Sequence, residues 1–132
     1  MTTIESKPVE IGRTPEALYE FLSAIGNFEG LMPSQVESWK TNGDECRFRI
    51  RGMADLGMRI SKRTPHHEIK LDSTKPAPFS FTLFCTIEPT GSQASRLTMR
   101  MDADLNPMLK MMAAGPLENF LNYLAEGCVE RG

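Results

Sequence analysis

A chain of 132 residues with 40% hydrophobic and 24% charged residues has the composition of a folded globular protein, which excludes global disorder. Its 15 basic and 17 acidic side chains give a net charge of −2, which excludes the basic footprint of a protein that binds nucleic acid or an anionic membrane surface. Its apolar runs are shorter than the roughly 20 residues of a membrane span, and its N-terminus lacks a secretion-signal pattern. With three widely separated cysteines, we expect a reduced cytoplasmic protein with no integral membrane segment, forming a single domain over residues 1–132.

A first strand and a first helix are predicted near the N-terminus. Residues 2–12 read as a strand, and Pro8 places a bulge or an edge position in its middle. Thr14 can cap a helix whose first position is Pro15. Hydrophobic residues then recur at helical spacing, at Leu18, Phe21, Leu22 and Ile25. We therefore expect a strand followed at once by a helix.

A second short helix and a series of strands follow. In this interpretation Gly26 ends the first helix, Asn27 caps the second, and Pro33 stops it. From residue 35 to residue 105 hydrophobic residues alternate with polar ones, as in antiparallel strands with one buried and one solvated face. Turn signals divide this region at Asn42-Gly43-Asp44, around Ala54-Asp55, and at Thr64-Pro65, Lys75-Pro76 and Pro89-Thr90-Gly91.

The last predicted element is one amphipathic helix over residues 106–132. Asn106 and Pro107 repeat the pattern of a cap followed by proline. Its apolar stripe comprises Leu109, Met112, Leu117, Phe120, Leu121, Leu124 and Cys128. Gly115-Pro116 interrupts the stripe, so we expect a kink or a near-break there.

The order of these elements resembles that of the START/Bet v 1-like superfamily (SRPBCC), also called the polyketide cyclase/dehydrase and lipid-transport group, and the chain is similar to a small bacterial member. The resemblance rests on residues 14–22, residues 32–39, the hairpin from Phe48 to Met58, and Asn106-Pro107-Met108. It implies an α+β helix-grip fold. In that fold a curved antiparallel sheet of about seven strands wraps on a long C-terminal helix, with two short helices after the first strand. Members bind many different ligands, so the fold alone specifies no function.

The resemblance further implies a hydrophobic cavity between the sheet and the C-terminal helix. The candidate ligand-binding residues have inward parity on the strands or belong to the helix stripe: Phe48, Ile50, Met58, Ile60, Phe81, Leu83, Met99, Met101, Leu109 and Met112. Methionine is frequent among them, and it suits an adaptable apolar surface. The alternative is that these side chains fill a packed core, because periodicity does not distinguish a packed interior from a lined cavity.

The histidines, the cysteines and the tryptophan have ordinary structural explanations. His66 and His67 are adjacent at a turn, where two neighbouring side chains do not readily chelate one ion, so we predict no metal site and no cofactor. Buried cysteine usually behaves as a small apolar residue, and we interpret Cys46, Cys85 and Cys128 in that way. Trp39 is expected to pack under a loop rather than to serve as a stacking platform.

Arginines gather on the predicted outer face. Arg47, Arg49 and Arg51 alternate on one strand, and further basic residues lie on the next. We interpret this face as solvated and partly paired with carboxylates. The alternative is docking of an acidic protein partner.

We predict no catalytic residue, because the inward set contains no Asp, Glu or Arg that could move protons or polarise a carbonyl group. The leading hypothesis is non-enzymatic binding or transport of a small hydrophobic ligand, such as a lipid, an isoprenoid or a polyketide-like molecule. One alternative is a protein-interaction module with a filled core. Another is an enzyme of the cyclase or dehydratase type, which needs an ionisable group deep in the cavity.

Overall fold

The computed structural model describes residues 1–131, with side chains placed through Glu130. Its elements in chain order are β1 (Thr2–Glu5), β2 (Val9–Ile11), α1 (Pro15–Leu22), the 3-10 helix η1 (Ile25–Leu31), β3 (Val36–Asn42), β4 (Glu45–Ile50), β5 (Ala54–Thr64), β6 (Glu68–Ser73), β7 (Phe81–Gly91), β8 (Ala94–Ala103) and α2 (Pro107–Arg131). All eight strands form one antiparallel sheet in the order β1-β8-β7-β6-β5-β4-β3, and β2 also pairs with β8. The predicted α+β helix-grip fold is confirmed. Gly132, where we predicted the last helix to end, lies outside the described residues.

The first predicted strand is divided in two, as Pro8 indicated. β1 pairs with one end of β8 and β2 with the other, so that Thr2 faces Ala103 and Ile11 faces Ser95. Between them, the backbone N–H of Ser6 donates to the carbonyl of Met99 over 2.8 Å. Both segments therefore pair with the same neighbouring strand, β8, in spite of the interruption.

The cap predicted for α1 is confirmed, whereas the boundary between the two short helices is corrected. The hydroxyl of Thr14 accepts a hydrogen bond from the N–H of Ala17 over 3.2 Å. The helix ends at Leu22 rather than near Gly26. The side chain of Asn27 does not cap η1, because its amide donates to the carbonyl of Phe21 over 2.8 Å. Asn27 thereby ties η1 to the end of α1.

Two predicted turns are displaced by one or two residues. The turn between β4 and β5 lies at residues 51–53, before the predicted Ala54-Asp55, and its Gly52 has a φ of +79°. Glycine takes this left-handed conformation without the steric penalty of a Cβ atom. β7 continues through Pro89 to Gly91, with an irregular register in its pairing to β8, so the next turn falls at residues 92–93.

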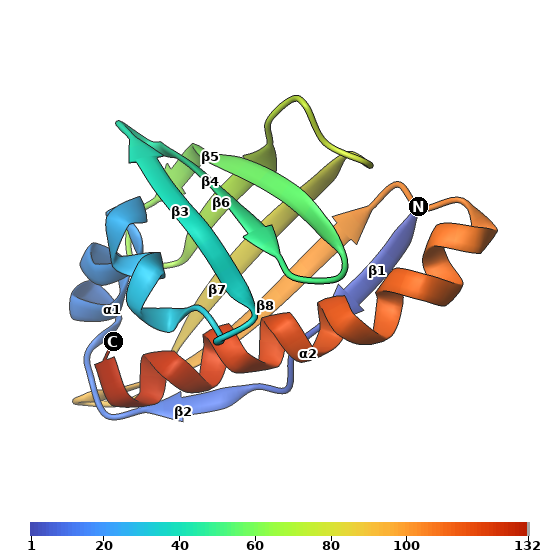
Figure 1. Cartoon of the computed structure of the whole chain (residues 1–132). Coiled ribbons are helices and arrows are strands. Elements are labelled where there is room, and N and C mark those ends of the chain that lie inside the picture. Colours follow the sequence, from blue (N-terminus) through green and yellow to red (C-terminus); the bar gives the residue numbers. More distant parts are fainter. Residues whose placement is uncertain (132) are drawn as a thin grey trace.

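Helix α2 lies across the open face of the curved sheet, and its C-terminal end approaches α1 and η1 (Figure 1). The side chain of Asn106 accepts from the N–H of Leu109 over 2.8 Å, which confirms the predicted cap. Of the kink or near-break predicted at Gly115-Pro116, the near-break is wrong, since the helix runs unbroken through Pro116, and the kink stays a prediction. A Cβ on the residue before proline disfavours helical backbone, and Gly115 has none. Across residues 1–131, no helix is long and apolar enough to cross a membrane.

Candidate functional site

The inner wall of the molecule is built from side chains of one parity on adjacent strands. One cross-strand row runs over five strands through Ile60, Leu71, Leu83, Met101 and Ile4, which face one another in register. All eight predicted strand residues lie on this wall and are buried: Phe48, Ile50, Met58, Ile60, Phe81, Leu83, Met99 and Met101. The period of two therefore predicted the face correctly.

The C-terminal half of α2 covers this wall. Its buried side chains are Leu117, Phe120, Leu121, Leu124, Ala125 and Cys128. They join the strand residues in one hydrophobic core. In this part of the molecule the inward residues pack against one another.

The N-terminal half of α2 has a different environment, which corrects the predicted inward position of Met112. That side chain is 69% exposed, and Leu109 is only partly buried. The buried position at this level is Ala113, four residues before the buried Leu117. The predicted stripe reached Met112 by a step of three residues from Leu109. The spacing of four residues from Leu117 was the signal for Ala113.

A groove separates the middle of α2 from the β4–β5 hairpin, and we call it the hairpin groove. It has a volume of about 320 Å³. Its lining comes from the segment before β3, from the hairpin and from α2: Pro33, Gln35, Ile50, Arg51, Gly52, Met53, Met112, Pro116, Asn119, Phe120 and Tyr123. Of the ten predicted ligand-binding residues, Ile50 and Met112 line this groove. The prediction included none of the other nine lining residues.

Backbone hydrogen bonds fix the hairpin side of the groove. The N–H of Arg51 donates to the carbonyl of Gln35 over 2.8 Å, and the N–H of Met53 donates to the carbonyl of Ile50 over 2.9 Å. The first bond joins the hairpin to the segment before β3. The second closes the turn that Gly52 permits. The hairpin side of the rim is thus held by main-chain hydrogen bonds.

An aromatic row links the groove to the sheet edge. Phe48 stacks between Phe120 of α2 and Trp39 of β3, with ring centroids 5.8 Å apart and planes inclined by 22° in both pairs. Trp39 therefore takes part in a stack, which corrects the expectation that it packs under a loop. Offset stacking of this kind stabilises the position of each ring beyond simple burial. The floor of the groove is consequently continuous with the core.

Pro116 leaves a polar group at the groove. Proline has no backbone N–H, so the carbonyl of Met112, four residues earlier, lacks its helical donor. Both residues line the groove. The helix therefore has one main-chain acceptor without its usual donor at this level.

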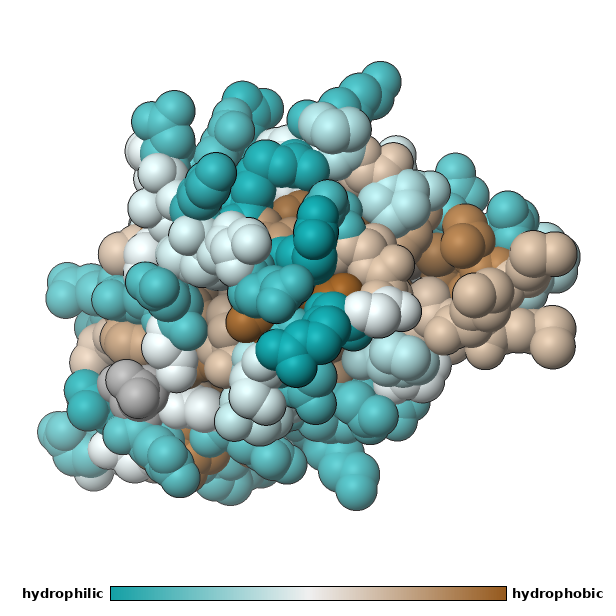
Figure 2. All heavy atoms as spheres, viewed as in Figure 1, coloured by the Kyte–Doolittle hydropathy of each residue, from teal (hydrophilic) through white to brown (hydrophobic). Residues whose placement is uncertain are grey.

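Exposed methionines extend the apolar surface beyond the groove. Met108 and Met111 are exposed together with Met112. Figure 2 shows hydrophobic surface gathered at the right of the view, where the N-terminal end of α2 lies in Figure 1. Most monomeric proteins expose hydrophobic side chains singly, so this cluster is a candidate contact surface.

A second hollow lies between the β6–β7 loop and the start of α2, with a volume of about 900 Å³. Leu109, another predicted ligand-binding residue, lines it. The guanidinium of Arg47 holds the loop by donating to the hydroxyl of Thr74 over 3.2 Å and to the carbonyl of Pro76 over 2.7 Å. The Arg47 side chain passes over Gly57, where a Cβ atom would collide with both Arg47 and Thr74. This hollow is more polar than the groove, since Lys75 and Asp104 belong to its lining.

Apart from Arg47, which holds the β6–β7 loop, the arginines of the outer face are engaged with carboxylates, in keeping with the expected partial pairing. Arg49 donates twice to Asp55, over 2.7 and 3.3 Å, and the pair lowers the pKa of that carboxyl group. Arg63 pairs with Asp44 over 2.9 Å, with the same effect on the pKa of Asp44. Arg51 has a weaker contact, since its Nε lies 3.7 Å from Glu37. Docking of a protein partner through Arg47, Arg49 and Arg51 stays a prediction.

The reactive side-chain types do not assemble into a centre. All three cysteines are buried, and burial raises the pKa of the Cys46 and Cys128 thiols to about 12. His66 and His67 are exposed at their turn. Within residues 1–131, no three His, Cys, Asp or Glu side chains lie close enough together to hold a metal ion.

Known structures share this architecture. The protein XoxI from Bacillus cereus superimposes with a TM-score of 0.79 at 12% identity, covering 99% of this chain and 95% of its own. Norcoclaurine synthase from Thalictrum flavum gives 0.76 at 13% identity, covering 98% and 85%. A START superfamily protein from Mycobacterium smegmatis gives 0.71 at 16% identity, covering 98% and 95%. At these identities the likeness shows the fold alone.

Comparison with curated proteins gives no match. The model of one family, described as polyketide cyclase / dehydrase and lipid transport, matches residues 1–131. This match covers nearly the whole chain and agrees with the helix-grip fold. The chain therefore belongs to the polyketide cyclase/dehydrase and lipid-transport family.

Proposed function

We propose that this protein binds a small hydrophobic ligand in the hairpin groove, without catalysing a reaction. The family and its START-like fold suggest ligand binding in general. The observation that carries the specific proposal is the groove itself, where the apolar side chains of Ile50, Met53, Met112 and Phe120 converge beside an exposed methionine cluster.

The chemistry of the interior favours binding over catalysis. Among the described residues, the buried polar side chains are Ser6 and Ser95, and each makes hydrogen bonds to the backbone. Neither is accompanied by a buried carboxylate, imidazole or ammonium group. Acid–base catalysis on a ligand held inside would require such a group.

The size of the groove sets the expected affinity. Burial of about 200 Å² of apolar ligand surface contributes about 5 kcal/mol at roughly 25 cal/mol per Å². The loss of translational and rotational freedom offsets part of this gain. A gain of about 5 kcal/mol corresponds to about 0.2 mM before this loss, so we expect dissociation constants of about 0.2 mM or weaker for a ligand without polar contacts.

Adjacent methionines provide a matched pair for testing the site. Met112 and Met111 are both exposed on α2, but only Met112 lines the groove. Replacement by Gln keeps the length and the helix propensity of the side chain while removing its apolar character. The reporter is N-phenyl-1-naphthylamine, an uncharged dye whose emission rises in apolar sites. Trp39, the single tryptophan, supplies an energy-transfer donor within the protein.

We expect saturable binding of the dye to the wild-type protein and a five- to tenfold weaker affinity for Met112→Gln. Met111→Gln should retain the wild-type affinity within a factor of two. Absence of saturable binding to the wild type would contradict the proposal. An equal loss in both variants would also contradict it, because that result would assign the dye to the methionine surface in general. Ligand contact by the other eight predicted residues stays a prediction.

A further inference from the structure

We propose that the ligand is an amphipathic carboxylate, with its apolar tail in the hairpin groove and its carboxylate on Arg51. This inference rests on the proposed function and names the chemical class of the ligand. The groove lining contains one ionic side chain, Arg51, and no acidic one. A low-polarity groove with a single guanidinium at its rim favours a ligand with one negative charge at one end.

Arg51 is available for such a ligand. Its side chain is 68% exposed, and its contact with Glu37 is a single approach of 3.7 Å, longer than an ordinary hydrogen bond. Arg49, two residues earlier on β4, shows the contrast, because it holds Asp55 with two donors. A guanidinium has five N–H donors in a planar fork that matches the two oxygens of a carboxylate. A bidentate ligand contact would therefore replace a weak one.

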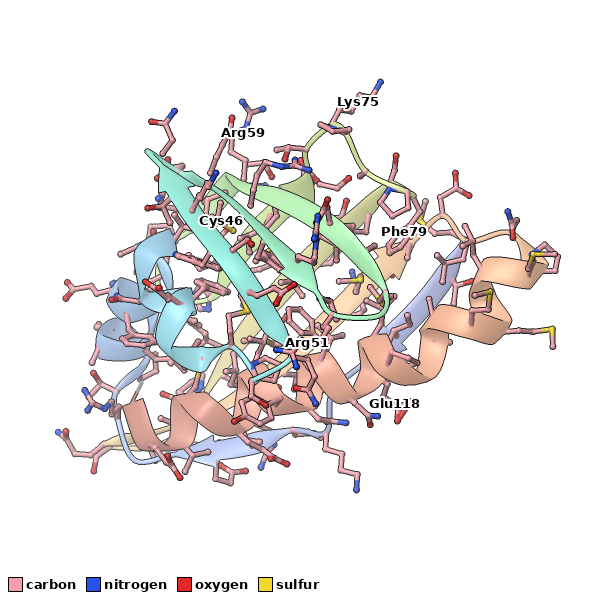
Figure 3. The ribbon with its side chains drawn as sticks, in the orientation of Figure 1. Cys46, Arg51, Arg59, Lys75, Phe79 and Glu118 are labelled. Carbon is pink, nitrogen blue, oxygen red and sulfur yellow. The ribbon has the colours of Figure 1, made fainter. Side chains whose placement is uncertain are left out.

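Uncharged donors surround the same rim. The side chains of Gln35, Asn119 and Tyr123 line the groove beside Arg51, and none of the three makes a hydrogen bond to another group of the described chain. Each can donate to a carboxylate oxygen that Arg51 leaves unfilled. Figure 3 shows Arg51 next to α2, whereas Glu118 projects from the far side of that helix.

The groove also fixes a rough ligand size. Its volume of about 320 Å³ equals that of about ten water molecules at about 30 Å³ each. A medium-chain acid such as decanoate fits this space, with the end of its chain reaching the exposed Met108 side of the helix. Decanol is the neutral counterpart with the same chain. Its hydroxyl can donate to the Met112 carbonyl, which a carboxylate cannot do.

Arg59 supplies the matched control for Arg51. It is 60% exposed and lies 3.9 Å from Glu45, which makes its ion pair as weak as that of Arg51. It belongs to β5 and lies away from α2 (Figure 3). The variants Arg51→Gln and Arg59→Gln therefore remove the same charge, and only the first removes it from the groove.

The experiment measures displacement of N-phenyl-1-naphthylamine by decanoate and by decanol at neutral pH, below the micelle concentration. For the wild-type protein we expect decanoate to bind at least tenfold more tightly than decanol. Arg51→Gln should weaken decanoate about tenfold and leave decanol within twofold. Arg59→Gln should change neither. Raising the salt concentration should weaken decanoate alone, since salt screens the exposed charge of Arg51.

Two outcomes overturn the inference. Equal affinity of the wild type for decanol and decanoate would remove the role of the charge, and an unchanged decanoate affinity in Arg51→Gln would remove the role of this residue. Both outcomes leave the proposed function standing as long as decanol displaces the dye. If neither the dye nor either ligand binds the wild type, the proposed function itself fails.

Discussion

The two halves of α2 carry similar hydrophobic residues in opposite environments. From Leu117 onward the helix lies on the sheet, and Leu121 is completely buried. Before Pro116 it presents methionines to solvent, and Met111 is 88% exposed. The second half of the helix thus holds the fold together, and the hairpin groove meets the helix where the two halves join, between Met112 and Tyr123.

This difference places a filled interior beside an open groove in one small helix-grip fold. The inner wall that we considered as a cavity lining is packed against the second half of α2. The hairpin groove opens instead on the side of the helix that faces the β4–β5 hairpin, between Met112 and Tyr123.

The largest predicted effect separates the two halves by stability. Leu121→Ala removes a completely buried side chain and should lower the free energy of unfolding by about 2–5 kcal/mol. Met111→Ala removes an exposed one and should change it by less than about 0.5 kcal/mol. Urea unfolding followed by circular dichroism measures both. Similar losses in the two variants would contradict the assignment of one half as covered and the other as uncovered.

A smaller effect should arise from pH at the covered half. Burial raises the pKa of the Cys128 thiol from 9.0 to about 12. Above pH 9 the unfolded chain releases this proton and the folded chain keeps it, so rising pH favours the unfolded state. Stability present below pH 9 should therefore be lost between pH 9 and pH 12, by up to about 1.4 kcal/mol for each pH unit.

Cys128→Ala isolates this contribution, because all other titrating groups are common to both proteins. The stability advantage of the wild type over Cys128→Ala should shrink as the pH rises from 8 to 11. Urea unfolding at each pH measures the difference. A constant difference would show that the thiol ionises equally easily in the folded and unfolded states, and hence that it is not enclosed beneath α2.

The strand faces could be predicted because a period of two assigns every residue to one side of a sheet. Phe81, Leu83 and Met99 are buried as predicted, and the errors at the turns did not affect them. The caps of α1 and α2 were equally accessible to prediction, because Thr14 and Asn106 act within three residues of their own positions. The helix caps and the alternation of hydrophobic residues along the strands were together sufficient to predict the fold.

The groove could not be predicted in the same way, because it depends on contacts between distant segments. Helical spacing indicates which side of α2 is apolar, but it does not indicate how far the sheet extends along that side. Met112 was misplaced because the sequence does not show where along α2 the sheet ends. The segment at Gln35 reaches the groove only through pairing of β3 with β4 and the hydrogen bond from Arg51. The spacing of residues along the chain does not predict that contact.

The central claim is that a ligand contacts α2 at the hairpin groove and leaves the packed interior undisturbed. The methyl groups of the nine methionines test it directly, because they sample the groove, the core and the free surface. In a titration with decanoate followed by methyl NMR of 13C-labelled methionine, Met53 and Met112 should show the largest saturable shifts, and Met58, Met99 and Met101 should stay in place. Saturable shifts of those three core methionines with no change at Met112 would contradict the account and place the ligand beneath the helix.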